Sequence, residues 1–138
     1  DEKELCTAVK SSNFKKVNDS YGHKAGDITL KEISIIMKEC SRKTDLVTRY
    51  GGEEFLIILT NTGLEGAYSF GENLLKQIRS KKIKISSNKT IKITASLGLS
   101  TWNFSKDETC KSIEELIDLA DRAMYRAKEN GRNRVETL

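Results

Sequence analysis

At residues 49–55 the chain reads Arg49-Tyr50-Gly51-Gly52-Glu53-Glu54-Phe55, between two apolar runs, 46–50 and 55–59. Two β-rich runs joined by Gly-Gly predict a β-hairpin. Glycines at its tip adopt positive φ and, having no side chain, let a ligand touch the backbone. Because neighbouring strand residues point to opposite faces, Glu53 and Glu54 cannot serve one ligand alike, and one of them is free to hold a cation. An ordinary hairpin with exposed carboxylates is the other interpretation of this stretch alone.

The segments on either side of the hairpin have the patterns of further strands and helices. Apolar residues at helical spacing predict helices over about 25–41, 64–78 and 112–130. Ser112 with Glu115 forms a capping box at the start of the last helix, and Gly131 is its natural stop. Strands are predicted over 5–9, 91–99 and 134–137, a short strand over 82–85 pairing with the 91–99 strand, and a basic turn over 14–19.

This order is β-α-β-β-α-β followed by a further helix, which predicts an α+β fold. The expected architecture is a palm-like or ferredoxin-like sheet that contains antiparallel strands, with flanking helices on one face. The chain has 138 residues, no proline and no Gly/Ser linker, so a single domain over 1–138 is predicted. Such a fold hosts many activities, so the function has to come from the site.

The amino-acid composition is that of a globular protein, with 37% hydrophobic and 32% charged residues. No apolar run approaches the ~20 residues of a membrane-spanning helix. The net charge of +4 is too small to indicate nucleic-acid binding by itself, but it suits a phosphate-rich small ligand. A nucleic-acid-binding palm is disfavoured, because no aromatic stripe lies beside a basic patch; Trp102 and Phe104 are expected to pack at a strand end.

The three cysteines, Cys6, Cys40 and Cys110, are odd in number and far apart in the sequence. Their spacing matches neither a zinc site nor a disulfide framework. We therefore expect small, buried or half-buried thiols in a reducing compartment, which places the domain in the cytoplasm.

Several motifs accompany the hairpin, in a fixed order along the chain. They are Asn13-Phe14-Lys15-Lys16-Val17-Asn18-Asp19, Tyr21-Gly22-His23, Gly26-Asp27, Thr94-Ala95-Ser96-Leu97-Gly98 and Tyr125-Arg126-Ala127-Lys128-Glu129-Asn130-Gly131-Arg132-Asn133. With the hairpin they resemble the GGDEF family of diguanylate cyclases, over residues 5 to 135. The resemblance implies bacterial signalling enzymes that condense two GTP into cyclic di-GMP plus pyrophosphate.

The resemblance implies a role for each residue of the hairpin, which in the family lies over the GTP phosphates. Gly51, Gly52, Glu53 and Glu54 match the catalytic turn. Glu53 also matches a carboxylate that coordinates Mg²⁺, a metal that prefers oxygen ligands, and the backbone carbonyl of Ser11 is a further ligand. Two magnesium ions are expected from the family.

The resemblance also divides the nucleotide between two groups of residues. Asn18 and Asp27 match the residues that bind guanine, whose ring N–H and amine a carboxylate can accept together. Phe14, Lys15, Lys128 and Arg132 match the phosphate-binding residues, and the four-residue spacing of the last two is expected to put them on one face of a helix. The other interpretations are a helix N-cap for Asp27 and simple helix stabilisation by the two C-terminal cations.

An element that binds the product is also implied. Arg42 and Asp45 match the family's RxxD motif, at which cyclic di-GMP inhibits its own synthesis. Arginine can hold a phosphate or a guanine edge through two parallel hydrogen bonds. A surface ion pair is the alternative. Asn73 stands where many members carry a second arginine, which is expected to weaken product binding.

The chain departs from the family where its first strand should end in Asp-x-Asp-x-Phe. Here it reads Lys10-Ser11-Ser12-Asn13-Phe14, so Lys10 replaces the metal-binding aspartate and Ser12 the second aspartate. Two metals normally activate the attacking hydroxyl and neutralise the pyrophosphate. Two hypotheses follow: a cyclase with a compromised metal site, or a binding domain that senses GTP or cyclic di-GMP without chemistry. The lysine could also reach the triphosphate and take over part of the metal's role.

The expected partners are GTP, cyclic di-GMP and a second copy of the domain, because in the family one domain supplies one GTP. No nucleic-acid or membrane contact by this segment is expected. A sensory or dimerising domain is expected upstream, so this segment is expected to be the C-terminal part of a longer signalling protein, with or without a membrane anchor. His23 is expected to order its loop by a hydrogen bond rather than act as a base.

Overall fold

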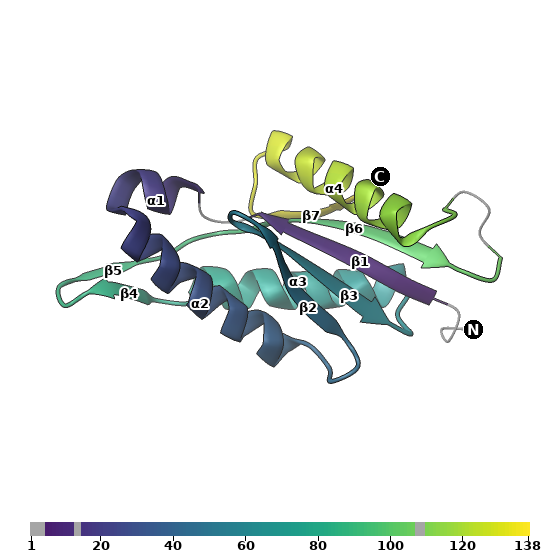
Figure 1. Cartoon of the computed structure of the whole chain (residues 1–138), viewed down its shortest axis with the longest axis horizontal. Helices are drawn as coiled ribbons and strands as arrows, with labels where there is room; N and C mark the ends of the chain where they lie inside the picture. The colour runs from purple at the N-terminus through teal and green to yellow at the C-terminus, as the bar shows by residue number, and fades with distance from the viewer. Residues whose placement is uncertain (1–4, 13–14, 107–109) are drawn as a thin grey trace.

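β1 lies at the centre of a five-stranded sheet whose strands are ordered β2-β3-β1-β6-β7 (Figure 1). The computed structural model describes residues 5–12, 15–106 and 110–138, the side chains of Lys15 and Lys16 excepted. Neighbouring strands are antiparallel except β6 and β7, which are parallel. The described elements are β1 (Leu5–Ser12), α1 (Lys15–Tyr21), α2 (His23–Cys40), β2 (Leu46–Gly51), β3 (Glu54–Thr60), α3 (Leu64–Ser80), β4 (Ile83–Ser86), β5 (Lys89–Ile91), β6 (Ser96–Asn103), α4 (Ile113–Glu129) and β7 (Arg134–Thr137).

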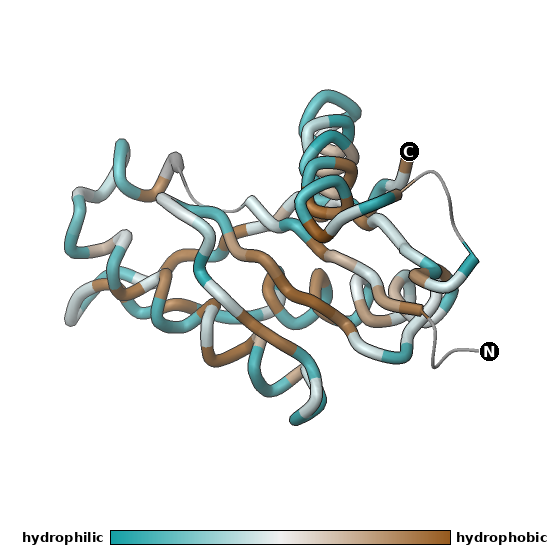
Figure 2. The backbone as a smooth tube through the Cα atoms, turned by 45° about the vertical axis from the view of Figure 1, so that its right-hand side comes forward, coloured by the Kyte–Doolittle hydropathy of each residue, from teal (hydrophilic) through white to brown (hydrophobic). Residues whose placement is uncertain are grey.

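The sheet is covered by helices on both faces, so the expectation of helices on one face is wrong. Alternate residues of β1 belong to different cores: Val9 packs in the cluster that includes α2 and α3, and Ala8 packs beneath α4. Figure 1 shows α4 on one side of the sheet and α2 and α3 on the other. A strand that buries both faces needs cover on both, and Figure 2 shows the strongest hydrophobic segments running through the middle of the sheet. The α+β class with flanking helices is confirmed.

Gly98 lets α4 lie directly on β6. A Cβ at this position would stand 2.0 Å from the backbone nitrogen of Met124 and 2.2 Å from the carbonyl oxygen of Ala120. Small residues on α4, including Ala120, Ala123 and Ala127, are fully buried against the sheet. This close approach brings the C-terminal end of α4 to the end of β1, where the candidate site lies.

Two elements differ from the expected ones. The predicted basic turn is the short helix α1, which Gly22, at φ 89°, joins to α2. The predicted 91–99 strand is divided, because β5 pairs with β4 in a separate two-stranded sheet while β6 begins at Ser96. The short strand predicted over 82–85 is β4, which pairs with β5 at the start of the predicted 91–99 strand. The hairpin of β4 and β5 projects beside α1 (Figure 1).

The helix ends follow their capping residues. Ser112 caps α4 by accepting a hydrogen bond from the Glu115 backbone nitrogen at 3.1 Å, as predicted, while the Glu115 carboxylate accepts from the Lys111 nitrogen at 3.0 Å. α2 begins at His23, so Asp27 lies inside the helix and the N-cap interpretation of Asp27 is wrong. None of the helices in the described part of the chain combines the length and apolar character needed to cross a membrane.

Candidate active site

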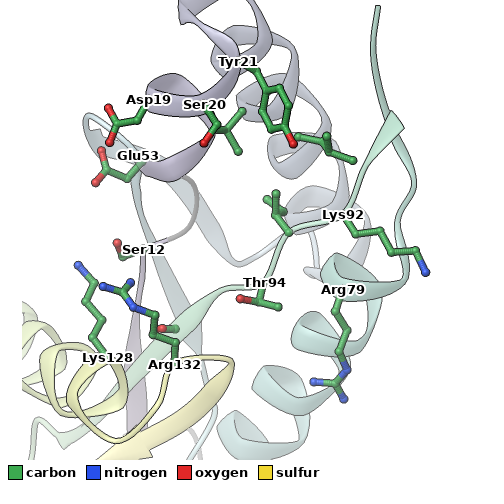
Figure 3. Close-up of a pocket in the computed structure, with 14 residues that line it drawn as sticks. Ser12, Asp19, Ser20, Tyr21, Glu53, Arg79, Lys92, Thr94, Lys128 and Arg132 are labelled. Atoms are coloured by element: carbon green, nitrogen blue, oxygen red, sulfur yellow. The ribbon is translucent and has the colours of Figure 1, made fainter. Parts of the chain in front are cut away.

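The glycine hairpin between β2 and β3 sends its two glutamates to different places. Gly52 adopts φ 49°, and the Arg49 side chain donates to its carbonyl oxygen at 3.0 and 3.2 Å, which closes the turn. Glu53 faces an open pocket (Figure 3), whereas Glu54 forms an ion pair with Lys10 at 3.0 Å. The two carboxylates thus face different surroundings, although Glu53 lies in the turn and not in a strand as the prediction assumed.

The pocket that Glu53 faces has a volume of about 800 Å³. It lies where β1 and α4 end and α1 begins, and the stretch between β5 and β6 forms its far wall. Lys128 and Arg132 extend from the end of α4 toward Ser12, while Asp19 and Glu53 lie across from them (Figure 3). The pocket therefore presents Lys128 and Arg132 at its base, two further cations, Arg79 and Lys92, on another side, and an apolar wall that includes Val17, Ile91 and Ile93.

Lys128 and Arg132 come together through a helix cap and not through a shared helix face, so that expectation is wrong. α4 ends at Glu129, and Gly131, at φ 120°, turns the chain back. The Arg132 nitrogen donates to the Ala127 carbonyl at 2.8 Å, which is the Schellman arrangement. Arg132 itself adopts φ 65°, a left-handed conformation that is rare outside glycine.

The two residues predicted to bind guanine lie beside one another, outside the pocket that Glu53 faces. Asn18 on α1 has a buried Oδ1 that accepts no hydrogen bond from the described residues. That oxygen lies against Gly26, where a Cβ would be 1.6 Å away. Asp27, the next residue, is exposed and lines a neighbouring groove of about 510 Å³ together with Arg49 and Phe55. The hairpin therefore contributes one side to the pocket and the other to the groove.

Two of the predicted phosphate-binding groups cannot be placed. Phe14 lies outside the described residues, and of Lys15 only the backbone, at the start of α1, is described. His23 begins α2 and its side chain is exposed, so its expected role in ordering the loop stays a prediction.

Lys10 lies on the α4 side of β1 and is only 2% exposed. Its Nζ donates to Asp121 at 2.9 Å, forms an ion pair with Glu54 at 3.0 Å and sits 4.1 Å from the ring centre of Tyr50. Burial alone lowers the pKa of Lys10, but the hydrogen bonds and charges of Asp121 and Glu54 outweigh it. The pKa is therefore raised overall, and the ammonium is charged at neutral pH.

Comparison with known proteins identifies the family. The sequence model of the diguanylate cyclase GGDEF domain matches residues 6–134. The chain belongs to the GGDEF family. It is 46% identical to diguanylate cyclase A of Treponema denticola over 122 residues, which is 88% of this chain and 32% of that protein. It is 40% identical to the diguanylate cyclase DgcM of Escherichia coli over 127 residues, 92% of this chain and 29% of DgcM.

Solved GGDEF domains share the fold. The GGDEF domain of YfiN from Pseudomonas aeruginosa superposes with a TM-score of 0.86 at 26% identity, covering 96% of this chain and 81% of that one. The GGDEF domain of DgcB from Caulobacter crescentus, solved in complex with cyclic di-GMP, gives a TM-score of 0.85 at 26% identity, with 96% and 77% covered. The chain spans about a third of the length of the curated relatives it matches.

The residues of this GGDEF domain do not fit two magnesium ions, although the family implies metal-dependent catalysis. Lys10 stands at the position matched to the family's metal-binding aspartate, and its ammonium holds Glu54 and Asp121. Ser11, whose carbonyl the family would use, is fully buried in β1 between Phe55 and Leu97 of the adjacent strands. Within residues 5–12, 15–106 and 110–138, no three His, Cys, Asp or Glu side chains gather as a metal site.

The RxxD element of this GGDEF domain joins two turns at the opposite end of the sheet. The Asp45 carboxylate accepts from the backbone nitrogens of Arg42 at 2.9 Å and Thr60 at 3.2 Å. The Arg42 guanidinium pairs with Asp45 at 3.3 Å and donates to Thr62 Oγ1 at 2.6 Å. Asn73 donates to Cys40 Sγ at 3.7 Å. The element therefore has a structural role, and its binding of product stays a prediction.

Sequence reasoning missed Asp121, the second carboxylate that holds Lys10. It lies seven residues before Lys128, so the two share a face of α4, and that spacing could have indicated it. Tyr50 was quoted only as part of the hairpin, although its ring covers the ammonium of Lys10. Its side chain gave no separate signal, because a tyrosine in a strand is ordinary.

Proposed function

We propose that this GGDEF domain binds GTP across its glycine hairpin and that the site condenses two GTP into cyclic di-GMP and pyrophosphate. One observation carries the proposal: a pair of cations lies on one side of the hairpin and a pair of guanine-matching acceptors lies on the other. The cations are Lys128 and Arg132, and the acceptors are Asn18 and Asp27. The diguanylate cyclases to which the chain is similar support the same reaction.

The phosphate end of GTP is assigned to the pocket at the end of α4. A triphosphate carries several negative charges, and two cations that converge on one point neutralise part of them. Arg132 can hold two phosphate oxygens at once, while Lys128 acts as a point charge. Their placement beside Ser12 sets the phosphates at the end of β1, under the hairpin.

The guanine end is assigned to Asn18 and Asp27. The buried Oδ1 of Asn18 lacks a donor among the described residues, and buried acceptors are normally satisfied. Guanine offers a ring N–H and an exocyclic amine, which suit an amide oxygen and a carboxylate. Adenine lacks this pair of donors, so the site is expected to select GTP over ATP.

The reaction requires the 3′-hydroxyl of one GTP to attack the α-phosphate of another, with pyrophosphate as the leaving group. The new P–O bond forms as the bond to the β-phosphate oxygen breaks, and the hydroxyl proton must be accepted. Glu53 is the hairpin carboxylate that faces the pocket, so we assign the proton to it. Lys128 and Arg132 stabilise the charge that develops on the pyrophosphate. Because each domain supplies one GTP, two copies must meet, at least transiently.

A second candidate function is favoured by Lys10. With its ammonium held by Glu54 and Asp121, the domain lacks the two-metal arrangement, and it could bind GTP as a sensor without forming product. Both candidates use the same nucleotide site and differ only in the chemical step. For either of them we place the domain in the cytoplasm, where GTP and cyclic di-GMP are available, and retain cyclic di-GMP as a ligand of Arg42 and Asp45.

The test is a calorimetric titration with a non-hydrolysable GTP analogue, followed by a product assay with GTP. Binding of the GTP analogue and not of the ATP analogue, with cyclic di-GMP formed, supports the cyclase. Binding without product supports the sensor. Lys128→Ala is expected to lose binding, and Arg122→Ala is the matched control, since Arg122 is exposed on α4 and pairs with Asp118 away from the pocket. Absence of GTP binding by the unaltered domain contradicts both candidates.

A further inference from the structure

The ammonium of Lys10 sits among groups from three separate segments of the chain. Lys10 itself is on β1, Glu54 and Tyr50 belong to the glycine hairpin, and Asp121 is on α4. The Nζ atom lies 2.9 Å from Asp121 and 3.0 Å from Glu54, and the Tyr50 ring lies 4.1 Å away. One cation therefore ties the hairpin to both the central strand and the helix that carries Lys128.

The cluster sets two carboxylates around a single buried cation. The Lys10 side chain is 3% exposed, while Glu54 and Asp121 are 31% and 48% exposed. A buried ammonium is tolerated when carboxylates and an aromatic face compensate the water it has lost. Each carboxylate, in turn, contacts the ammonium directly, and its exposed part remains in contact with water.

A divalent ion has no place in this cluster. It would have to displace Lys10 from two direct contacts, and it would meet the repulsion of a fixed positive charge at short range. Lysine also cannot swing out easily, because its side chain is almost completely enclosed. The sequence alone allowed Lys10 to reach the triphosphate. In the structure its ammonium is held beneath the hairpin by Glu54 and Asp121 and does not line the pocket.

We propose that Lys10 is a built-in cation that fixes the glycine hairpin on α4, so that the hairpin holds its shape, and the domain binds nucleotide, without a divalent metal. The hairpin part of this inference stands on the geometry alone, and the nucleotide part rests on the proposed function. It makes Lys10 a positioning residue: its ammonium acts on the hairpin through Glu54 and Tyr50 and does not touch the nucleotide.

The first experiment uses the unliganded domain, so it does not depend on GTP binding. Thermal unfolding is measured in chelator and in millimolar Mg²⁺ or Mn²⁺. The unaltered domain is expected to melt at the same temperature in each. Lys10→Asp gathers three carboxylates at one place, so it is expected to melt lower in chelator and to recover when metal is added. Lys10→Met removes the ammonium without adding a ligand, and its loss is expected to persist with metal.

A rise in the melting temperature of the unaltered domain on adding Mg²⁺ or Mn²⁺ would overturn the inference. So would equal stability of Lys10→Met and the unaltered domain. If Lys10→Asp does not fold in chelator, recovery of the folded protein by refolding in Mg²⁺ supports the inference. Equal melting temperatures of Lys10→Asp and Lys10→Met in the presence of metal contradict it.

The second experiment measures affinity for a non-hydrolysable GTP analogue with and without divalent metal. The unaltered domain is expected to keep its affinity within about twofold in chelator, while Lys10→Asp is expected to lose about tenfold there and regain it with Mg²⁺. A tenfold metal dependence of the unaltered domain contradicts the inference. Absence of binding under every condition contradicts the proposed function instead, and the melting results still decide the role of Lys10.

Discussion

Glu53 and Glu54 are neighbours in the sequence, but they lie in opposite electrostatic surroundings. Glu53 faces an open pocket with Lys128 and Arg132 across from it, whereas Glu54 is joined to an enclosed ammonium. Glu53 lies in the turn and Glu54 is the first residue of β3, so the boundary between turn and strand separates the two carboxylates. The comparison teaches that Glu53 belongs to the proposed ligand site whereas Glu54 attaches the hairpin to the fold, and substitutions should separate these two roles.

The largest expected effect is on the ligand side. Replacing both Lys128 and Arg132 by alanine should weaken binding of the GTP analogue by about 3 kcal/mol, roughly a hundredfold, because two charge-assisted contacts are lost. Calorimetric titration measures this change. Stability should change little, and Arg122→Ala should bind normally. Equal binding by the double variant and the unaltered domain would show that the phosphates lie elsewhere.

The next effect is on the attachment side. Lys10→Met should lower the free energy of unfolding by about 2 kcal/mol, which is less than for a fully buried pair, because the two carboxylates are partly exposed. Urea unfolding with a linear extrapolation gives the value. Lys84→Met, at an exposed lysine of β4, should leave stability unchanged. The same loss in both variants would mean that the Lys10 cluster adds nothing.

Glu54→Gln tests the comparison directly and should cost about 1 kcal/mol of stability, because a charge-assisted contact becomes a neutral one while Asp121 still holds the ammonium. Glu53→Gln is its matched control one residue away, and its stability should match that of the unaltered domain. Both are measured by urea unfolding. If Glu53→Gln is the more destabilised variant, the assignment of sides is reversed.

The smallest effect concerns the charge of Glu53 itself. In chelator, Glu53→Gln should bind the GTP analogue slightly more tightly, by about 0.5 kcal/mol, because a carboxylate that repels phosphate across a solvated pocket is removed. Titration at low ionic strength measures it best. Product formation, if present in the unaltered domain, should fall. Weaker binding of the variant would instead mean that Glu53 attracts the phosphates through a cation.

Much of the fold followed from local patterns. The Gly-Gly hairpin, the capping box at Ser112 and the short final strand were predictable, because each depends on residues close in sequence. The placement of helices on both faces was not predictable, although β1 buries six residues in succession and β3 buries three in succession. A continuous apolar run does not say by itself what covers it.

The site was predictable where side chains match a motif and not where tertiary packing decides. The sequence identified Lys10 as the departure from the family, but not the direction of its side chain. That direction depends on Asp121, a residue 111 positions away along the chain. Likewise, Lys128 and Arg132 line the same pocket, but the predicted reason, a shared helix face, was wrong. The cap at Gly131 reverses the chain after α4 and so places Arg132 beside Lys128. Long-range partners and cap geometry are settled by the fold.

That cap has a consequence for how the site is maintained. Arg132 and Asn133 follow Gly131 in left-handed conformations, at φ 65° and 48°. Such conformations cost side-chain-bearing residues on the order of 1 kcal/mol each, which a glycine at the same place would avoid. The guanidinium is therefore presented to the pocket by a backbone that is stressed before any ligand arrives. Stability alone would favour glycine or asparagine at position 132, so under the proposed function the arginine there gives up backbone stability in exchange for a contact with phosphate.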